Sequence, residues 1–416
     1  MTKTISLREL AVPLIKSIDS FNYLLKSHHR RTAVISYYVG SKMGLSQNQM
    51  IDLVIAAALH DIGALSVQER DMLIQQDVEN PFPHCLMGYK MLSSFETFKN
   101  IAQIIKHHHI KYLLAETVED EVLLQSHIIH LADRVDIKIS TDKFILTQKS
   151  EVVDAITSKC GTIFHPDVCD NFVDVAKADI FWIDINNMTT EQLFNKIDFD
   201  TTHELTVKEI MDFALTVSRI IDFRSKFTAT HSYTVGHLAS SVGKMFNLGE
   251  DMCNKLLVAG YFHDIGKIGI DTSFIEKPGP LTSEEFDQVK LHCYYSGQIL
   301  DELNTSDWFK DIVNWAKHHH EKLDGTGYPF AIGGDEIDMG TKIIAYSDII
   351  SALMEKRPYR DGLDIQTTLD LIEEDVAQKI DPEMFPVLIA NRDKIVEIVK
   401  QCEREALIVY SKAMKS

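Results

Sequence analysis

Two short stretches of this sequence carry residue types that bind metals and phosphates. The first, His-Asp-Ile-Gly-Lys, begins at His263 and follows an apolar run typical of a buried helix. The second begins with the histidine triple at 318–320 and ends in Gly-Tyr-Pro at Pro329. Imidazole nitrogens and carboxylate oxygens suit divalent first-row metals, and one carboxylate can bridge two ions. An isolated His-Asp pair is most often a capping aspartate beside a core histidine, but here further ligand-type residues favour a metal site.

The candidate ligands in this part of the chain are five histidines and two aspartates. They are His231, His263, Asp264, His292, His319, His320 and Asp348. Metal sites inside helical bundles have this dispersed pattern, because facing helices project their side chains inward. Seven ligands are too many for one ion and fit two ions with Asp264 as the bridge. Two ions about 3.5–4 Å apart are a standard arrangement for hydrolysing a phosphodiester.

Lys267 follows His263 by one helical turn, so both side chains are expected on the same face. A cation there would stabilise charge on phosphate oxygens, which makes Asp264 and Lys267 the catalytic candidates. The alternative, a solvated lysine at a helix end, fits the neighbouring ligands less well.

The loop that follows the histidine triple is expected at the rim of the same pocket. Gly325 and Gly327 permit a sharp turn, and Pro329 stiffens its exit. The turn can bring backbone amides and Tyr328 to the substrate. The alternative is a plain surface turn. The glycines lack the Walker spacing, so no nucleotide triphosphate cradle is predicted.

The chain contains two copies of one unit. The sequence around His28 matches that around His231 at an offset of 203, and His-Asp-Ile-Gly recurs at that offset. Later matches follow with small changes in offset. The first-copy counterparts of the ligands are His28, His60, Asp61, His84, two members of the triple 107–109 (with His108 and His109 as the candidates) and Asp133. Such ordered matches indicate an internal duplication.

The apolar periodicity of both copies is helical. Val235, Leu238 and Val242 line one face of a segment after His231, and no segment alternates convincingly as a strand. The predicted fold is all-α, with two tandem bundles of about seven helices each. We expect a first domain at 1–185, a polar linker at 186–205 and a second domain at 206–416. A leading helix at 206–224 and a helical tail at 397–416 complete the second domain.

The composition indicates a soluble globular protein, with 45% hydrophobic and 25% charged residues among 416. Neither a signal peptide nor a long apolar run is present, so we expect no membrane segment and a cytoplasmic location. The net charge of −19 argues against DNA or RNA binding through a broad basic face. Six cysteines without C-x-x-C spacing predict reduced, mostly buried thiols.

The two linked motifs, over about 207–400, resemble the HD superfamily of metal-dependent phosphohydrolases and, within it, the HD-GYP subfamily. That resemblance implies hydrolysis of cyclic dinucleotides to linear products, and it makes the seven residues above the metal ligands. It assigns Lys267 to the scissile phosphate, and Arg357 and Arg360 to other substrate phosphates. His318 has no family role and is expected to be structural.

The resemblance also suggests iron or manganese, whereas the ligands alone would accept zinc or nickel as well. Some family members hold a third metal through a glutamate, and Phe227 occupies that position here. Two metals are therefore expected.

The first copy lacks the residues expected to face phosphate. Ala64 replaces the lysine, Asp142 falls where Arg357 would be, and no Gly-Tyr-Pro loop follows His109. We interpret it as a degenerate HD domain that stabilises, regulates or dimerises the second, with its metal site either vestigial or occupied.

The leading prediction is a phosphodiesterase for cyclic di-GMP or 3′,3′-cyclic GMP-AMP. The alternatives are a general HD nucleotide phosphohydrolase, which would lack the Gly-Tyr-Pro loop, and a cyclic-dinucleotide receptor or scaffold without turnover. A homodimer through helical surfaces is the default oligomeric state.

Overall fold

The computed structural model divides into two compact units, which are described separately below. It describes residues 2–4, 8–9, 11–12, 14–15, 27–64, 82–117, 122–197, 204–223, 225, 228–303, 307–356, 361–375 and 377–414. The N-terminal bundle spans residues 18–202, and the C-terminal bundle combines 203–415 with 1–17. The expected boundaries placed the first residues of the chain in the first domain, whereas here they group with the second.

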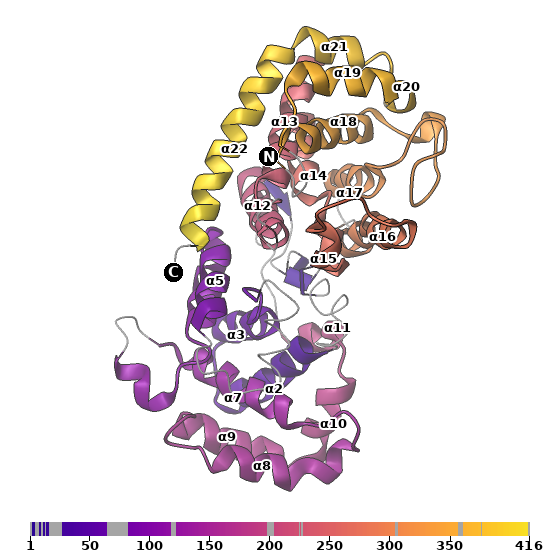
Figure 1. Cartoon of the computed structure of the whole chain (residues 1–416). Helices are drawn as coiled ribbons and strands as arrows, with labels where there is room; N and C mark the ends of the chain where they lie inside the picture. The colour runs from indigo at the N-terminus through magenta and orange to yellow at the C-terminus, as the bar shows by residue number, and fades with distance from the viewer. Residues whose placement is uncertain are drawn as a thin grey trace. The chain divides into compact units, whose positions relative to one another are not determined.

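The N-terminal bundle is built from α-helices (Figure 1), and three of its connections contain a short 3-10 turn. Its α-helices are α2 (His28–Lys42), α3 (Gln47–Leu59), α5 (Phe82–Leu92), α6 (Lys99–Lys106), α7 (Leu124–Lys138), α8 (Lys149–Thr157), α9 (Pro166–Ala176), α10 (Asp179–Asn187) and α11 (Thr190–Asn195). Its 3-10 turns are η1 (Glu96–Phe98), η2 (Tyr112–Thr117) and η3 (Ile145–Gln148). Helix α11 lies within the range expected as a linker, and Thr189 begins it with a capping box.

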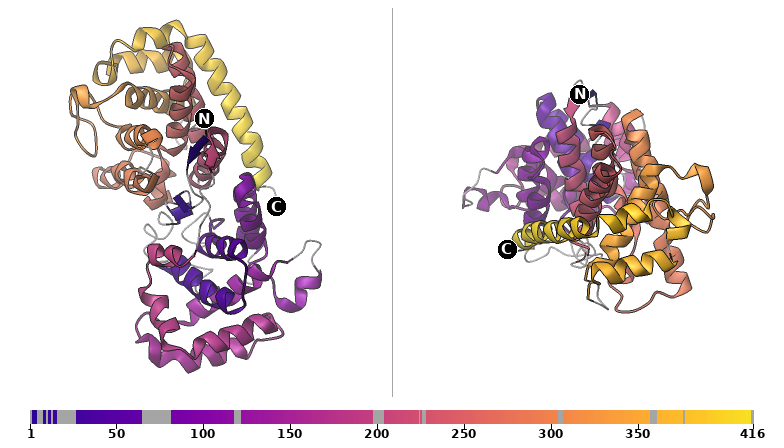
Figure 2. Two further views of the ribbon diagram at one scale, coloured as in Figure 1. Left: turned by 180° about the vertical axis from the view of Figure 1, so that it is seen from behind. Right: turned by 90° about the horizontal axis from the view of Figure 1, so that it is seen from above.

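The C-terminal bundle is also helical. Its α-helices are α12 (Val207–Asp222), α13 (His231–Met245), α14 (Glu250–Phe262), α15 (Thr272–Ile275), α16 (Ser283–Leu300), α17 (Asp307–His318), α18 (Met339–Met354), α19 (Ile365–Asp375), α20 (Ala377–Ile380), α21 (Phe385–Ala390) and α22 (Arg392–Met414). The 3-10 turns are η4 (Ile265–Gly269), η5 (Asp301–Leu303) and η6 (Gly334–Glu336). Figures 1 and 2 show the long helix α22, in yellow, running beside α13, with which it is in contact.

Two three-residue strands depart from the all-helical expectation. Strand β1 (Thr2–Thr4) pairs antiparallel with β2 (Glu204–Thr206), and Thr2 lies opposite Thr206. Such short strands have no alternation long enough to detect in a sequence. This pairing ties the start of the chain to the start of helix α12, whose N-cap is Thr206.

The duplication is visible in the packing of both bundles. Helices α2 and α3 pack together as α13 and α14 do, and α5 packs on α6 as α16 does on α17. Likewise α7 packs on α2, and α18 packs on α13. The prediction of two tandem all-helical bundles is therefore confirmed.

Local sequence signals fix where the site-bearing helices begin. Thr282 and Glu285 form a capping box at the start of α16, and Asp338 accepts a hydrogen bond from the Thr341 amide at the start of α18. Behind the site, Trp315 and Phe262 are fully buried. Burying a side chain of that size contributes roughly 1.5–3 kcal/mol.

One glycine in each bundle allows a close backbone contact beside the candidate ligands. A Cβ on Gly266 would lie 2.0 Å from the His292 carbonyl oxygen, and one on Gly63 would lie 2.1 Å from the His84 carbonyl oxygen. The segment after His-Asp therefore presses directly on the helix that carries the next histidine. A side chain at this position would push these two elements apart.

Gly266→Ala should lower the thermal unfolding temperature, because overpacking costs about 1–3 kcal/mol and here the opposing atoms are backbone. Gly279→Ala is the matched control, since no atom lies within 4 Å of a Cβ built there. Thermal unfolding of both variants checks this. Equal unfolding temperatures for Gly266→Ala and the control would contradict it.

The prediction that all six cysteines are reduced is wrong at one pair. Cys160 and Cys169 form a disulfide, with Cα atoms 6.2 Å apart. A tight turn between α8 and α9 brings the two side chains together, and spacing alone did not indicate this. The other four cysteines are buried, and none of them forms a disulfide with another described residue. None of the described helices is both long and apolar enough to cross a bilayer.

Candidate metal centre

The seven side chains predicted as ligands lie together in the C-terminal bundle. His231 begins α13, His292 lies in α16 and Asp348 in α18. His263 and Asp264 follow the end of α14, and His319 and His320 follow the end of α17. Five separate helices thus contribute to one cluster, which explains why its members are dispersed in the sequence.

Asp264 lies at the centre of this cluster. Its Oδ2 is 3.2 Å from His263 Nε2 and 3.6 Å from His231 Nε2. Its Oδ1 is 3.4 Å from His292 Nε2 on the other side. The two oxygens therefore face different histidines, as a bridging carboxylate requires.

Asp348 completes the cluster from the opposite helix. Its Oδ1 is 3.1 Å from His231 Nε2 and 3.9 Å from His263 Nε2. Its Oδ2 is 3.9 Å from His320 Nδ1.

Backbone carbonyls orient three of the histidines. The Nδ1 atoms of His263, His292 and His319 lie 2.7, 2.6 and 2.7 Å from carbonyl oxygens three residues earlier. A carbonyl can only accept, so each Nδ1 carries a proton and each ring turns its Nε2 toward the cluster.

The electrostatics favour the protonation states that metal binding needs. Burial would raise the pKa of Asp264, but His263 and Lys267 hold it well below its usual range. Burial likewise opposes ionisation of Asp348, and His231 nevertheless keeps its pKa well below the usual range. Burial lowers the pKa of His292 to about 3 and that of His320 to about 4. At neutral pH the carboxylates are thus ionised and these two imidazoles are neutral.

Several buried polar atoms of this cluster have no hydrogen-bond partner among the described residues, and a bound cation would satisfy them. His263 Nε2 and Asp264 Oδ1 are buried without a hydrogen bond among the described residues. His292 Nε2 and His319 Nε2 face each other at 3.3 Å, although both Nδ1 protons point to carbonyls. Two facing lone pairs repel unless a positive charge lies between them. The residues present therefore fit a divalent metal.

Glu355 is a functional neighbour that the sequence analysis missed. It is buried, and its Oε2 lies 3.1 Å from Nδ1 of His231, whose Nε2 faces the cluster. Ser351 and Thr230 also donate hydrogen bonds to this carboxylate. Glu355 directly follows the end of α18, seven residues after Asp348, and this spacing of about two helical turns was the available signal.

Lys267 lies at the edge of the cluster. Its Nζ forms an ion pair with Asp264, and its side chain is 20% exposed. It also lines a small cavity with Asp222 and Thr228. Burial raises the pKa of Asp222 to about 7.

The glycine-rich loop lies against His320, one of the candidate ligands. The Tyr328 ring is 4.8 Å from the His320 ring, centre to centre, and its amide donates to the His320 carbonyl. Gly325 has a φ of 74°, which favours glycine. A Cβ on Gly327 would lie 2.4 Å from Cα of Glu321.

Glu321 holds this loop in place, a role that the sequence analysis did not assign. Its buried carboxylate accepts a hydrogen bond of 2.7 Å from the Phe330 amide. The ring of His318, the extra member of the triple, packs against the ring of Phe330. Three other predicted positions, Arg357, Arg360 and Phe227, lie outside the described residues.

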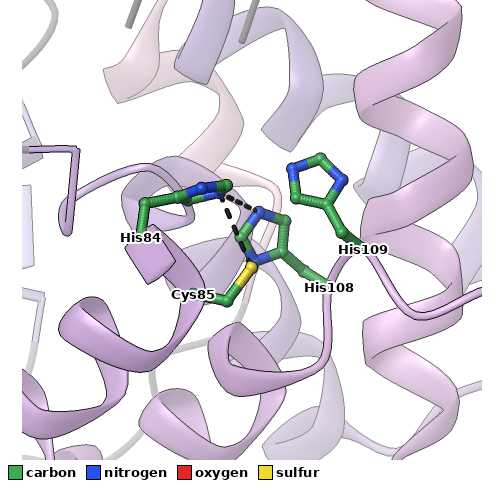
Figure 3. A group of neighbouring side chains, drawn as sticks. All are labelled: His84, Cys85, His108 and His109. Atoms are coloured by element: carbon green, nitrogen blue, oxygen red, sulfur yellow. Dashed lines mark hydrogen bonds between the residues drawn. The ribbon is translucent and has the colours of Figure 1, made fainter. Parts of the chain in front are cut away.

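The N-terminal bundle contains a matching cluster of buried side chains. It comprises His28, His60, Asp61, His84, His108, His109 and Asp133. Figure 3 shows part of it, where His84 from α5 meets His108 and His109, which follow α6. His84 Nε2 is 3.3 Å from both Asp61 Oδ1 and His108 Nε2.

This second cluster differs in its cation. Ala64 is buried where the C-terminal bundle has Lys267, and Arg134 instead contacts Asp133, with Nη2 2.9 Å from Oδ2. The sequence analysis missed this replacement. His60 is also distinct. Burial alone would lower its pKa, but the adjacent Asp61 carboxylate has the opposite effect, and the pKa of His60 is raised to about 9.

Both clusters include a cysteine that was not among the predicted ligands. Cys293 Sγ is 3.4 Å from His292 Nε2, and Cys85 Sγ is 3.6 Å from His84 Nε2. Burial and the nearby Asp264 raise the pKa of the Cys293 thiol well above its usual value. The His-Cys dipeptide repeated in both copies was the signal.

Glu355→Ala should weaken metal binding about 10–100-fold, the typical effect of removing an outer partner of a ligating histidine. The cause is the loss of the acceptor that orients His231. Metal titration of the metal-free protein measures this, with exposed Glu373→Ala in α19 as the control. Ser351 Oγ also lies 3.3 Å from His231 Nδ1, so unchanged affinity in Glu355→Ala would contradict the role proposed for the carboxylate.

Comparison with known proteins identifies two segments as HD domains, at residues 25–138 and 216–384. A 3′3′-cGAMP-specific phosphodiesterase of Vibrio cholerae is 26% identical over 408 residues, covering 95% of this chain and 94% of the relative. A cyclic di-GMP phosphodiesterase response regulator of Xanthomonas campestris is 28% identical over 186 residues, covering 44% of this chain and 49% of the relative. The crystal structure of a cyclic GMP-AMP-specific phosphodiesterase of V. cholerae shares the fold, with a TM-score of 0.61 at 22% identity over 94% of this chain and 98% of that one.

Proposed function

We propose that this chain, which belongs to the HD superfamily, is a metal-dependent phosphodiesterase of cyclic dinucleotides. Its second domain is of the HD-GYP type, and the proposal follows from that type. The observation that carries the proposal is the C-terminal cluster, in which buried carboxylates and inward-facing imidazoles converge beside Lys267. A receptor or scaffold without turnover would need neither a complete ligand set nor this lysine.

The metal ligands that we propose are Asp264 and the six residues clustered around it, with His231 and His263 on one side and His292 and His319 on the other. Two divalent ions fit this set, and iron or manganese remains the expectation from the family. When bound, such ions supply the nucleophile and neutralise charge in phosphodiester hydrolysis.

Residues of this chain then position and stabilise the substrate. Lys267 is charged and partly exposed beside the ligands, so its ammonium group can approach a phosphate oxygen there. Tyr328 covers His320 at the rim, and Glu321 keeps the loop that carries this tyrosine in place. Outside the described residues, Arg357 and Arg360 are proposed contacts to the other phosphate.

The substrate that we propose is a 3′,5′-linked cyclic dinucleotide hydrolysed to its linear form. One relative that matches both bundles is named as specific for 3′3′-cGAMP, which makes this compound the first to test. Cyclic di-GMP is the alternative, because the relative named for it matches part of the chain.

The N-terminal bundle is proposed to lack hydrolytic activity. Its Asp133 is neutralised by Arg134, and no lysine follows Asp61 in the manner of Lys267. It keeps the ligand-type side chains, and Asp61 Oδ1 is buried without a hydrogen bond among the described residues.

The first test is hydrolysis of 3′,3′-cyclic GMP-AMP and of cyclic di-GMP by protein reconstituted anaerobically with Fe²⁺ or Mn²⁺. Linear product is expected from one or both. Asp264→Ala should abolish it, because the central carboxylate is lost. Asp61→Ala, the same change in the other bundle, is the matched control and should retain turnover.

Either of two results would overturn this assignment. Tight binding without product in the wild-type protein would favour the receptor. Loss of turnover in a folded Asp61→Ala protein would place the reaction in the N-terminal bundle as well.

Lys267→Ala should reduce kcat by about 10²–10³-fold, the usual effect of losing one group that stabilises developing charge. Its metal content should be unchanged, since the imidazoles and Asp264 remain. Steady-state kinetics together with metal analysis measure both. Turnover equal to wild type in a fully loaded variant would exclude the role proposed for Lys267.

A further inference from the structure

The His-Cys dipeptide occurs at the same place in both bundles, and in each its sulfur lies against the ligand cluster. Cys85 follows His84 in α5, and Cys293 follows His292 in α16. We propose that these two cysteines are metal ligands, each acting as a thiolate beside the histidine that precedes it. This inference rests on the proposed metal dependence and adds a ligand of a different chemical type.

Distances among the candidate ligand atoms support one shared ion in the N-terminal bundle (Figure 3). Cys85 Sγ lies 3.6 Å from His84 Nε2, which is 3.3 Å from His108 Nε2. Asp61 Oδ1 lies 3.3 Å from His84 Nε2 and 3.8 Å from His108 Nε2. Metal bonds of 2.0–2.3 Å in a tetrahedron place ligand atoms about 3.3–3.6 Å apart, close to these separations.

The C-terminal bundle repeats this arrangement. Cys293 Sγ lies 3.4 Å from His292 Nε2 and 4.0 Å from His319 Nε2. The two Nε2 atoms are 3.3 Å apart, and Asp264 Oδ1 is 3.4 Å from that of His292.

A simple hydrogen bond from the thiol does not account for the whole cluster. One S–H can donate to only one of the two facing Nε2 lone pairs, and the other would stay unsatisfied. Asp264 Oδ1 and Asp61 Oδ1 are additional buried atoms without a hydrogen bond in the described parts of the chain. A cation satisfies the sulfur, both nitrogens and the carboxylate oxygen together.

Packing alone explains the cysteines less well than ligation does. A buried cysteine can act as a small apolar side chain, as Cys253 does with its sulfur near the Leu248 carbonyl. Cys85 and Cys293 instead have sulfur next to imidazole nitrogen in both copies. As each sulfur–metal bond forms, the thiol proton passes to the solvent, with no change of oxidation state.

A thiolate ligand changes which metals the site favours. Sulfur ligands favour zinc, cobalt and iron(II) over the hard ions magnesium and calcium. If the two cysteines are ligands, magnesium and calcium are therefore disfavoured in both bundles.

The test uses the full-length protein loaded anaerobically with Co²⁺, whose bonds to thiolate give an intense near-ultraviolet charge-transfer band. The wild-type protein should show this band. Cys85→Ser and Cys293→Ser should each weaken it, and the double variant should lose it while still binding Co²⁺ through nitrogen and oxygen. Cys253→Ser is the matched control and should leave the band unchanged.

Different results separate this inference from the proposed function. Bound Co²⁺ without a charge-transfer band in the wild-type protein, or a band that persists in the double variant, would overturn the cysteine ligands and leave metal dependence intact. No binding of Co²⁺, Fe²⁺ or Mn²⁺ would overturn both. If the serine variants fail to fold, the corresponding alanine variants provide the same comparison.

Discussion

The buried carboxylate of Asp264 imposes the constraint around which the C-terminal bundle is arranged. An isolated ionised carboxylate in a protein interior is strongly destabilising unless it is paired or bound to a metal. Here Lys267 pairs with one oxygen, and the other has no hydrogen bond among the described residues. His292 of α16 lies 3.4 Å from this carboxylate, so α16 must approach the segment that carries Asp264 closely. Gly266 permits that approach, because only a glycine allows η4 to touch the backbone of α16.

Comparison of the two bundles distinguishes residues that maintain the ligand cluster from the residue proposed to act in hydrolysis. Both keep the glycine, the inward histidines and the central aspartate, so these belong to the shared cluster. They differ in the cation: Lys267 contacts the central aspartate, whereas Arg134 contacts Asp133 on the opposite helix. The Arg134 guanidinium compensates the buried charge of Asp133. The position beside Asp61 that matches Lys267 is occupied by the small, uncharged side chain of Ala64. The same fold can thus keep a cluster of ligands and lose the group that would meet phosphate.

The sequence was most informative where chemistry and periodicity coincide. Helical periodicity and the repeat at an offset of 203 predicted two helical bundles, and the ligand-type residues predicted a cluster that the structure brings together. Contacts that depend on long-range packing were not predicted. The Thr2–Thr206 strand pair and the Cys160–Cys169 disulfide are of this kind, since neither has a repeating pattern or a known spacing. Arg134 was missed because it does not occupy the position that matches Lys267, where the sequence has Ala64. It pairs with Asp133 instead of with the central Asp61.

The orientation of several histidine rings in the two clusters is determined by neighbouring backbone atoms rather than by long-range packing. His60, His108, His263, His292 and His319 each place Nδ1 near the carbonyl oxygen three residues earlier. In a helical turn this carbonyl is always within reach, so the tautomer and the inward direction of Nε2 need no distant partner. His231 and His28 are the first residues of α13 and α2. They contact carboxylates instead, with Nδ1 near Glu355 and Asp136 respectively. These five histidines are therefore oriented by their own backbone, whereas His231 and His28, at helix starts, contact an acidic partner from another element.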